Sequence, residues 1–326
     1  MRYIIALLLT SASFGQTALA DVPKVVTDIL PVQSLAAAVM AGLGEPEVLL
    51  DKGASPHSFQ MRPSQAAAVA GADLVIWVGP ELTPWLDKAV DARGAGAAVL
   101  GLLAAPGTTL RQFPGGEEHA DEGQDHGDHD HAGHDHSDHD HAAHAHGHDH
   151  AHSGTDPHAW LDPANARAWV AAIAAELSRL DPENAARYAE NAATAVQAID
   201  AADARARAAL EPVKDRPFVA FHDAYGYFAG TYGLTLAGTI AAGDAASPGA
   251  RHLSDLQAQM QAAGPLCIFP EVQHDPKLIA QMAEATGARL GGALDPEGAG
   301  VDPGPGAWGA ILTGMADTIA TCLKDG

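Results

Sequence analysis

Three histidines in this chain have the residue type and the placement needed to bind a metal ion. His57 and His222 each follow a predicted strand, and His158 lies just before a predicted helix. A single loop histidine is most often an ordinary surface residue. Three at comparable positions favour a borderline metal such as Zn²⁺, because neutral imidazole nitrogens are among its preferred ligands.

Most of the other histidines are concentrated in one segment. Thirteen of the 18 lie between Glu117 and Ser153, with eleven acidic residues and no Lys or Arg. Many recur every five residues, which fits neither a helix nor a strand, so 115–154 is predicted to be a disordered loop. We expect secondary, weaker metal binding at His126, His129, His131, His134, His136, His139, His141, His144, His146, His148 and His150. The alternative is a solubilising insertion, and the remaining His252 and His274 are expected at the surface.

Composition excludes two classes of partner. The 326 residues carry a formal net charge of −23, about half of it from the histidine-rich segment. A nucleic-acid binder needs a cationic face, and so does a protein that docks on an anionic membrane. With 47% apolar residues, the chain is long enough for two globular domains.

The first 20 residues have the features of a secretory signal peptide. Met1-Arg2 precedes a short apolar run, and Ala18-Leu19-Ala20 precedes Asp21. This pattern predicts cleavage after residue 20 and a periplasmic location in a bacterium. The apolar run is too short to span a bilayer, and no cysteine follows it for lipid attachment, so no membrane anchor is expected.

Alternating strands and helices predict parallel βαβ units in both halves of the chain. In the first half, strands are predicted at 24–29, 48–50, 74–78 and 97–100, and helices at 31–40 and 62–69. In the second half, strands are predicted at 218–221, 234–236, 266–269 and 289–293, and helices at 253–262, 276–286 and 308–323.

Helices without internal glycine or proline connect these halves. One is predicted at 163–180, with Asp162 as its N-cap, and a longer one runs from 183 to about 210. We therefore predict an α/β fold of two parallel-sheet βα lobes joined by a long rigid helix. The expected boundaries are a signal peptide at 1–20, an N-terminal lobe at 21–165, linker helices at 166–212 with their long spine at 182–211, and a C-terminal lobe at 213–326.

This topology predicts a metal site between the lobes. Ligands of open α/β sheets bind at the carboxyl ends of the strands. His57 and His158 come from the first half and His222 from the second, so they are expected to meet in the interlobe cleft. A ligating imidazole usually donates the N–H of its other nitrogen to an acceptor, and Asp223 and Glu271 are candidates for this role. An ordinary surface position or a helix cap explains each of them equally well.

The segments around these histidines resemble a known family. The matching blocks are Gly53-Ala54-Ser55-Pro56-His57, Arg62-Pro63-Ser64, Ala72-Asp73-Leu74-Val75, Trp77-Val78-Gly79-Pro80-Glu81, Asp156-Pro157-His158, Trp160-Leu161-Asp162-Pro163, Phe221-His222-Asp223-Ala224-Tyr225-Gly226-Tyr227-Phe228, Gly264-Pro265-Leu266-Cys267-Ile268-Phe269 and Leu294-Asp295-Pro296. From about Val25 to Leu323, the chain resembles the ZnuA-type periplasmic zinc receptors of the cluster A-I solute-binding proteins.

The resemblance implies a set of site residues. It assigns His57, His158 and His222 as ligands, with either Asp295 or water as the fourth. The two cysteines are able to form one disulfide in an exported protein. The resemblance further implies that Cys267 and Cys322 form this pair.

The resemblance also implies a function. We expect a receptor that binds Zn²⁺ and delivers it to the permease of an ABC importer, acting as a monomer without enzymatic activity. The histidine-rich segment is expected to capture zinc for the cleft or to sense it. The alternatives are a zinc-dependent hydrolase, because three histidines and an open position also suit hydrolysis, and a periplasmic zinc buffer or chaperone.

Overall fold

The computed structural model describes residues 22–94, 97–113, 154–241, 248–264 and 266–324. The predicted signal peptide at 1–20 lies outside the described residues. So do all but the last residue of the predicted loop at 115–154, including its eleven candidate histidines. No helix in the described ranges combines the length and the apolar character needed to cross a membrane.

The N-terminal lobe contains a four-stranded parallel sheet with strand order β2-β1-β3-β4. Its strands are β1 (Val25–Thr27), β2 (Glu47–Val48), β3 (Leu74–Trp77) and β4 (Ala98–Gly101). Its helices are α1 (Leu30–Val39), α2 (Pro63–Gly71) and α3 (Pro84–Asp91). All four residues of β3 are buried because both faces of this central strand are covered. Val75 and Trp77 pack in the cluster under α2 and α3, whereas Leu74 and Ile76 join the main core.

The C-terminal lobe repeats this plan with strand order β10-β9-β7-β8, again parallel. Its strands are β7 (Phe218–Ala220), β8 (Leu236–Thr239), β9 (Cys267–Ile268) and β10 (Arg289–Leu290). Its helices are α6 (Gly226–Tyr232), α7 (Ala250–Ala263) and α8 (Lys277–Thr286). Val219 and Ile268 face the cluster under α7 and α8, while Phe218 and Phe269 face the main core.

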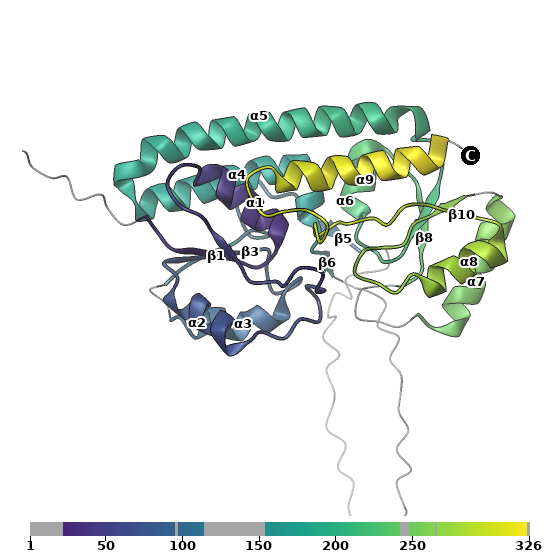
Figure 1. Ribbon diagram of the computed structural model, residues 1–326, viewed down its shortest axis with the longest axis horizontal. Coiled ribbons are helices and arrows are strands. Elements are labelled where there is room, and N and C mark those ends of the chain that lie inside the picture. The colour runs from purple at the N-terminus through teal and green to yellow at the C-terminus, as the bar shows by residue number, and fades with distance from the viewer. Residues whose placement is uncertain (1–21, 95–96, 114–153, 242–247, 265, 325–326) are drawn as a thin grey trace, which may run out of the picture.

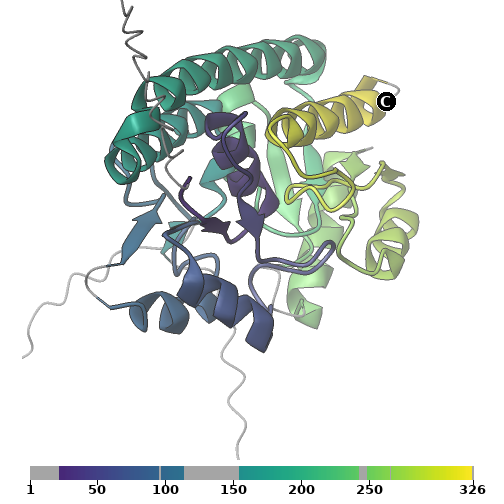
Figure 2. The same ribbon diagram turned by 60° about the vertical axis from the view of Figure 1, so that its left-hand side comes forward.

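Three helices join the two lobes. They are α4 (Pro163–Leu180), α5 (Ala185–Leu210) and α9 (Ala307–Lys324). Helix α5 packs against α4 and α9, and it runs along the top of both lobes (Figures 1 and 2). Its 26 residues correspond to about 39 Å at 1.5 Å per residue. The predicted α/β fold, with two lobes joined by a long helix, is confirmed.

Asp162 caps α4 as predicted, because its Oδ1 accepts the N–H of Ala164 at 2.8 Å. The predicted spine begins slightly later than expected, since Pro182–Asn184 forms a 3₁₀ turn before α5. A second 3₁₀ turn, Glu211–Val213, follows α5.

The final helix also ties the C-terminal lobe to the N-terminal one. The backbone N–H of Trp308 donates to Ser34 Oγ on α1 at 2.9 Å, and its indole N–H donates to Trp160 O at 2.9 Å. Trp160 in turn donates its indole N–H to Pro296 O at 2.9 Å. These buried bonds cross between the lobes, so the main core is continuous beneath the spine.

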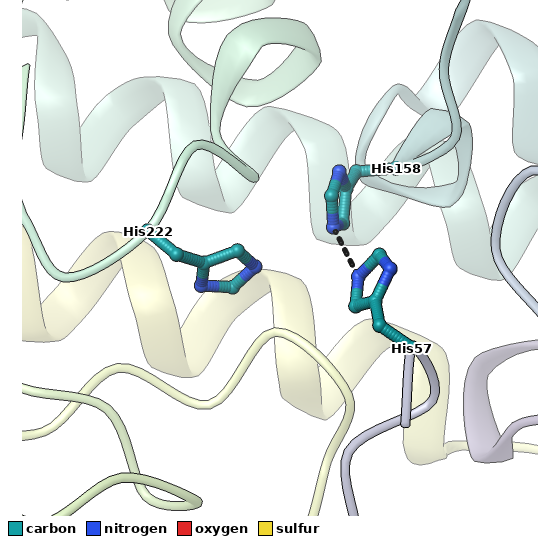
Figure 3. A group of neighbouring side chains, drawn as sticks. All are labelled: His57, His158 and His222. Atoms are coloured by element: carbon teal, nitrogen blue, oxygen red, sulfur yellow. Dashed lines mark hydrogen bonds between the residues drawn. The ribbon is translucent and has the colours of Figure 1, made fainter. Parts of the chain in front are cut away.

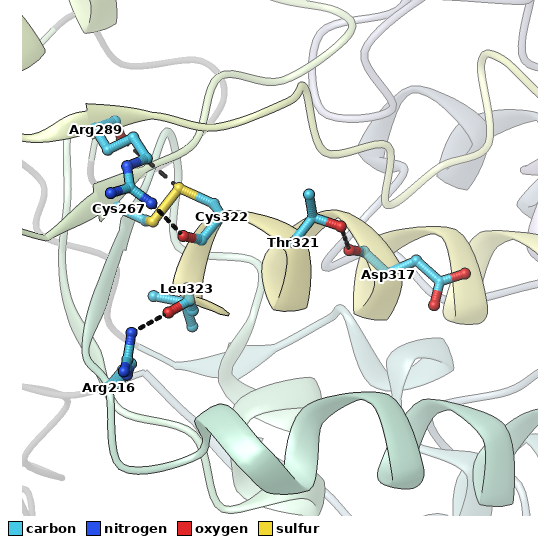
Figure 4. Close-up of a disulfide and its surroundings, with 7 residues drawn as sticks. All are labelled: Arg216, Cys267, Arg289, Asp317, Thr321, Cys322 and Leu323. Atoms are coloured by element: carbon cyan, nitrogen blue, oxygen red, sulfur yellow. Dashed lines mark hydrogen bonds between the residues drawn. A yellow bond between two sulfur atoms is a disulfide. The ribbon is translucent and has the colours of Figure 1, made fainter. Parts of the chain in front are cut away.

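A disulfide joins Cys267 on β9 to Cys322 near the end of α9, which confirms the implied pairing (Figure 4). Arg289 donates to Cys322 O at 3.0 Å, and Arg216 donates to Leu323 O. The end of the last helix is therefore fixed to the C-terminal lobe by one covalent bond and two guanidinium groups.

The structure contains elements that the sequence patterns did not indicate. Strands β5 (Arg111–Gln112) and β6 (Thr155–Asp156) form an antiparallel pair on either side of the histidine-rich segment. Helices α3 and α6 are also additional, and β8 begins two residues later than predicted. Two-residue strands are too short to show a hydrophobic period, which explains why β5 and β6 were missed.

Candidate metal centre

The three predicted histidines meet between the lobes. The Nε2 atoms of His57 and His158 are 3.3 Å apart, and His222 approaches from the opposite side (Figure 3). One ring nitrogen from each histidine lies within 4.8 Å of the other two. His158 and His222 are each 1% exposed, whereas His57 is half-buried. The cluster is therefore accessible mainly from the side of His57.

The loop after β2 positions His57. Asp51 and Arg62 form a two-bond ion pair at the two ends of this loop. Trp85 on α3 donates its indole N–H to Pro56 O at 2.6 Å, immediately before the histidine. These contacts hold the loop against the lobe, so the position of His57 depends in part on Trp85, which lies on a different element.

Asp156 positions His158. Its Oδ1 accepts both the backbone N–H of His158 at 3.0 Å and the ring Nδ1–H at 2.8 Å. Asp156 is the last residue of β6 and is 3% exposed. Tyr227 on α6 donates to the backbone oxygen of Asp156 at 3.0 Å, which links this ligand loop to the other lobe. A Cβ at position 226 would lie 2.9 Å from Asp156 Oδ2, so glycine at this position allows α6 to approach the loop closely.

Glu271 positions His222. The Nδ1–H of His222, which follows β7, donates to Glu271 Oε2 at 2.5 Å. The other carboxylate oxygen accepts the hydroxyl of Tyr225 at 2.8 Å and the backbone N–H of His222 at 3.4 Å. Strands β7 and β9 are parallel neighbours, so the residues that follow them lie side by side. Of the two candidate acceptors, the structure selects Glu271, which is 2% exposed.

These hydrogen bonds prepare the imidazoles for a metal. A neutral imidazole has one N–H and one lone pair. Because Nδ1 of His158 and of His222 donates to a carboxylate, Nε2 carries the lone pair in both rings. Two nitrogens bound to a tetrahedral Zn²⁺ at 2.0–2.1 Å lie about 3.3–3.4 Å apart, the separation seen between His57 and His158. The donor set and its spacing therefore fit zinc.

The other predicted residues lie elsewhere. The structure does not bring Asp295 into the three-histidine cluster. Its two carboxylate oxygens accept the backbone N–H groups of Ala299 and Gly300, each at 2.7 Å, so it closes a turn. His252 is exposed as predicted, with Nε2 at 2.8 Å from Thr239 O.

Two further residues were not anticipated. Asp156 was not singled out as an acceptor, although an Asp two residues before a histidine is a signal that could have suggested it. His274 differs from the expected surface residue: its side chain is 16% exposed and its ring stacks on Phe221, with centroids 4.2 Å apart.

A family model described as "ZnuA: Zinc-uptake complex component A periplasmic" matches residues 25–322, which is most of the chain. The chain belongs to this family. Among its relatives, the high-affinity zinc uptake system protein ZnuA of Paracoccus denitrificans is 50% identical over 97% of both chains. The recognition of a ZnuA-type zinc receptor from sequence motifs is confirmed.

Solved structures share the fold. A crystal structure of ZnuA aligns with a TM-score of 0.71 at 23% identity, covering 93% of this chain and 99% of the other. The periplasmic zinc-binding protein TroA of Treponema pallidum aligns with a TM-score of 0.73 at 20% identity, covering 92% and 99%. The two-lobed architecture with its long helix is thus the fold of metal-binding proteins in this group.

Proposed function

We propose that this protein is a receptor that binds one Zn²⁺ through His57, His158 and His222. The observation that carries the proposal is the convergence of three imidazoles from both lobes, two of them held by buried carboxylates. Neutral nitrogen ligands favour zinc over harder cations such as Mn²⁺. Because both oxygens of Asp295 accept backbone N–H groups, we propose water rather than this carboxylate as the fourth ligand.

The cellular setting is part of the proposal. The 1–20 segment is proposed to direct export and to be removed, placing the receptor in the periplasm. It then delivers zinc as a monomer to the permease of an ABC importer. The proposed divisions of the mature chain are those given above, with α9 as a helix of the C-terminal lobe that also packs against α1 and α5.

The histidine-rich segment is proposed to assist zinc acquisition or sensing. The described residues that flank it are joined, because Phe113 N–H donates to Gly154 O at 3.0 Å. That point lies four residues before His158. A tether rooted there keeps its own zinc ligands at high local concentration near the centre.

We propose a receptor in preference to the zinc hydrolase. A hydrolase needs a general base within reach of the metal-bound water. Among the described residues, the carboxylates of Asp156 and Glu271 contact these imidazoles, and both already accept imidazole N–H groups. Turnover of ester or amide substrates by the zinc-loaded protein would favour the hydrolase instead. If the histidine-rich segment alone buffered zinc, the alternative of a periplasmic zinc buffer or chaperone would be favoured.

The direct test compares His57→Ala, His158→Ala and His222→Ala with His252→Ala, measuring zinc affinity against a competing chelator. Each of the first three should lose the tight site, while the exposed His252 serves as the matched control. Tight binding that survives all three replacements would overturn the assignment. Growth in zinc-limited medium should then require both the receptor and its cognate permease.

A further inference from the structure

A second group of possible ligands adjoins the three-histidine centre on the side of the C-terminal lobe. His222, Glu271 and His274 each offer one nitrogen or oxygen atom, and these atoms lie within 4.8 Å of one another. Nε2 of His274 is 3.6 Å from Glu271 Oε2, the same oxygen that accepts the Nδ1–H of His222. Glu271 therefore lies between two imidazoles.

The spacing of this pair suits a shared cation. A separation of 3.6 Å is longer than a hydrogen bond but close to the roughly 3.3 Å between two ligands of one zinc ion. The stacking of His274 on Phe221 holds the ring in this orientation, with an interplanar angle of 20°. A carboxylate and an imidazole are both ordinary zinc ligands, and the carboxylate adds a negative charge that attracts the cation.

Burial places His274 outermost in the group. Its side chain is 16% exposed, compared with 1% for His222 and 0% for Glu271. A cation that approaches this group from solvent therefore meets His274 first. His222 is the innermost member, because its ring also belongs to the three-histidine cluster.

We propose that Glu271 and His274 form a second, weaker Zn²⁺ position beside the main centre, linked to it through the hydrogen bond between His222 and Glu271. The lone pair of His222 is on Nε2, because Nδ1 carries the hydrogen that Glu271 accepts, so His222 binds at the main centre only. When the main centre is filled, the second position has only Glu271 and His274 as protein ligands. Its affinity is correspondingly lower than that of the main centre, and it holds a second ion beside the filled centre.

This inference extends the proposed function and is tested on the full chain with zinc alone. Crystals grown with one equivalent and with excess ZnCl₂ are compared by anomalous scattering at the zinc edge. With excess zinc, a second peak is expected about 2.0–2.2 Å from His274 Nε2 and from an oxygen of Glu271. His274→Phe retains an aromatic ring on Phe221 without ring nitrogens and should lose this peak while retaining the main one.

The controls separate the two proposals. His274→Ala provides a second variant, and His252→Ala should change neither peak. A single peak at the three histidines in excess zinc would overturn the second position and leave the receptor function intact. Failure of the main peak would instead refute the proposed function. If His274→Phe retained the second peak, the assignment of His274 as a ligand would be wrong.

Discussion

Replacing Asp156 with asparagine tests whether a buried carboxylate next to a ligand controls zinc affinity. Asn has nearly the same shape as Asp and keeps an oxygen where Oδ1 accepts both N–H groups of His158. The substitution therefore removes the negative charge with little change in packing. It also allows the amide to rotate and present an NH₂ group to the imidazole, which would favour the wrong ring tautomer.

The expected loss follows from the two bonds that Oδ1 accepts. Hydrogen bonds to an ionised acceptor are roughly twice as strong as neutral ones. Acceptors behind metal-binding histidines typically contribute about 10–100-fold to metal affinity. We expect Asp156→Asn to weaken zinc binding in this range, which corresponds to about 1.4–2.7 kcal/mol. Because Asp156 is only 3% exposed, we expect a loss toward the upper end of this range.

The assay is a zinc competition titration with a chelator of comparable affinity, on the full chain. Asp162→Asn is the matched control, because Asp162 lies six residues further on and caps α4 through Ala164 N–H. Asn is also a good N-cap, so this control should preserve both stability and zinc affinity. A dissociation constant for folded Asp156→Asn within about twofold of the unchanged protein would refute the reasoning, given the 10–100-fold expectation.

Three further predictions concern stability. Burial raises the pKa of Asp28 to about 7, so the folded state holds a proton that the unfolded chain releases near pH 4. The free energy of unfolding should therefore fall from about pH 4 to about pH 7, by up to about 1.4 kcal/mol per pH unit, and Asp28→Asn should flatten this slope in urea titrations. Cys267→Ser opens a disulfide that spans 55 residues. Its loss should lower the unfolding free energy by up to about 4 kcal/mol, and an unchanged urea midpoint would contradict this. Gly298→Ala would place a Cβ 2.9 Å from Leu30 Cδ2 at a backbone φ of +80°, and should lower the unfolding free energy by about 1–3 kcal/mol. Gly314→Ala, with no atom within 4 Å of its Cβ, is the control and should be neutral or stabilising.

The overall fold was predictable because its elements are long or strongly patterned. The apolar run at 74–78 became β3, which is buried on both faces, and the proline at 163 marks the first residue of α4. The placement of His57 and His222 was predictable, since each follows a parallel strand of its own lobe and the carboxyl ends of parallel strands lie at one edge of a sheet. His158 instead follows β6, which pairs antiparallel with β5. In contrast, β5 and β6 have two residues each and depend on pairing with each other.

The residues behind the ligands depend on strand order, which local patterns do not fix. Asp223 is adjacent to His222 in sequence, whereas Glu271 is 49 positions away. Glu271 becomes the acceptor because β9 pairs directly with β7, with Phe218 opposite Cys267. Choosing between them required knowing that these two strands are neighbours.

The backbone around Asp295 gives its carboxylate other partners. Glu271 forms an isolated parallel bridge with Leu294, the residue before Asp295. The turn beyond then closes on Asp295 through Ala299 and Gly300. The carboxylates next to the three imidazoles are those of Asp156 and Glu271, and each accepts the N–H of one ring. A site that keeps its carboxylates one hydrogen bond from the cation presents imidazole nitrogen to it, and this arrangement selects zinc over cations that prefer oxygen.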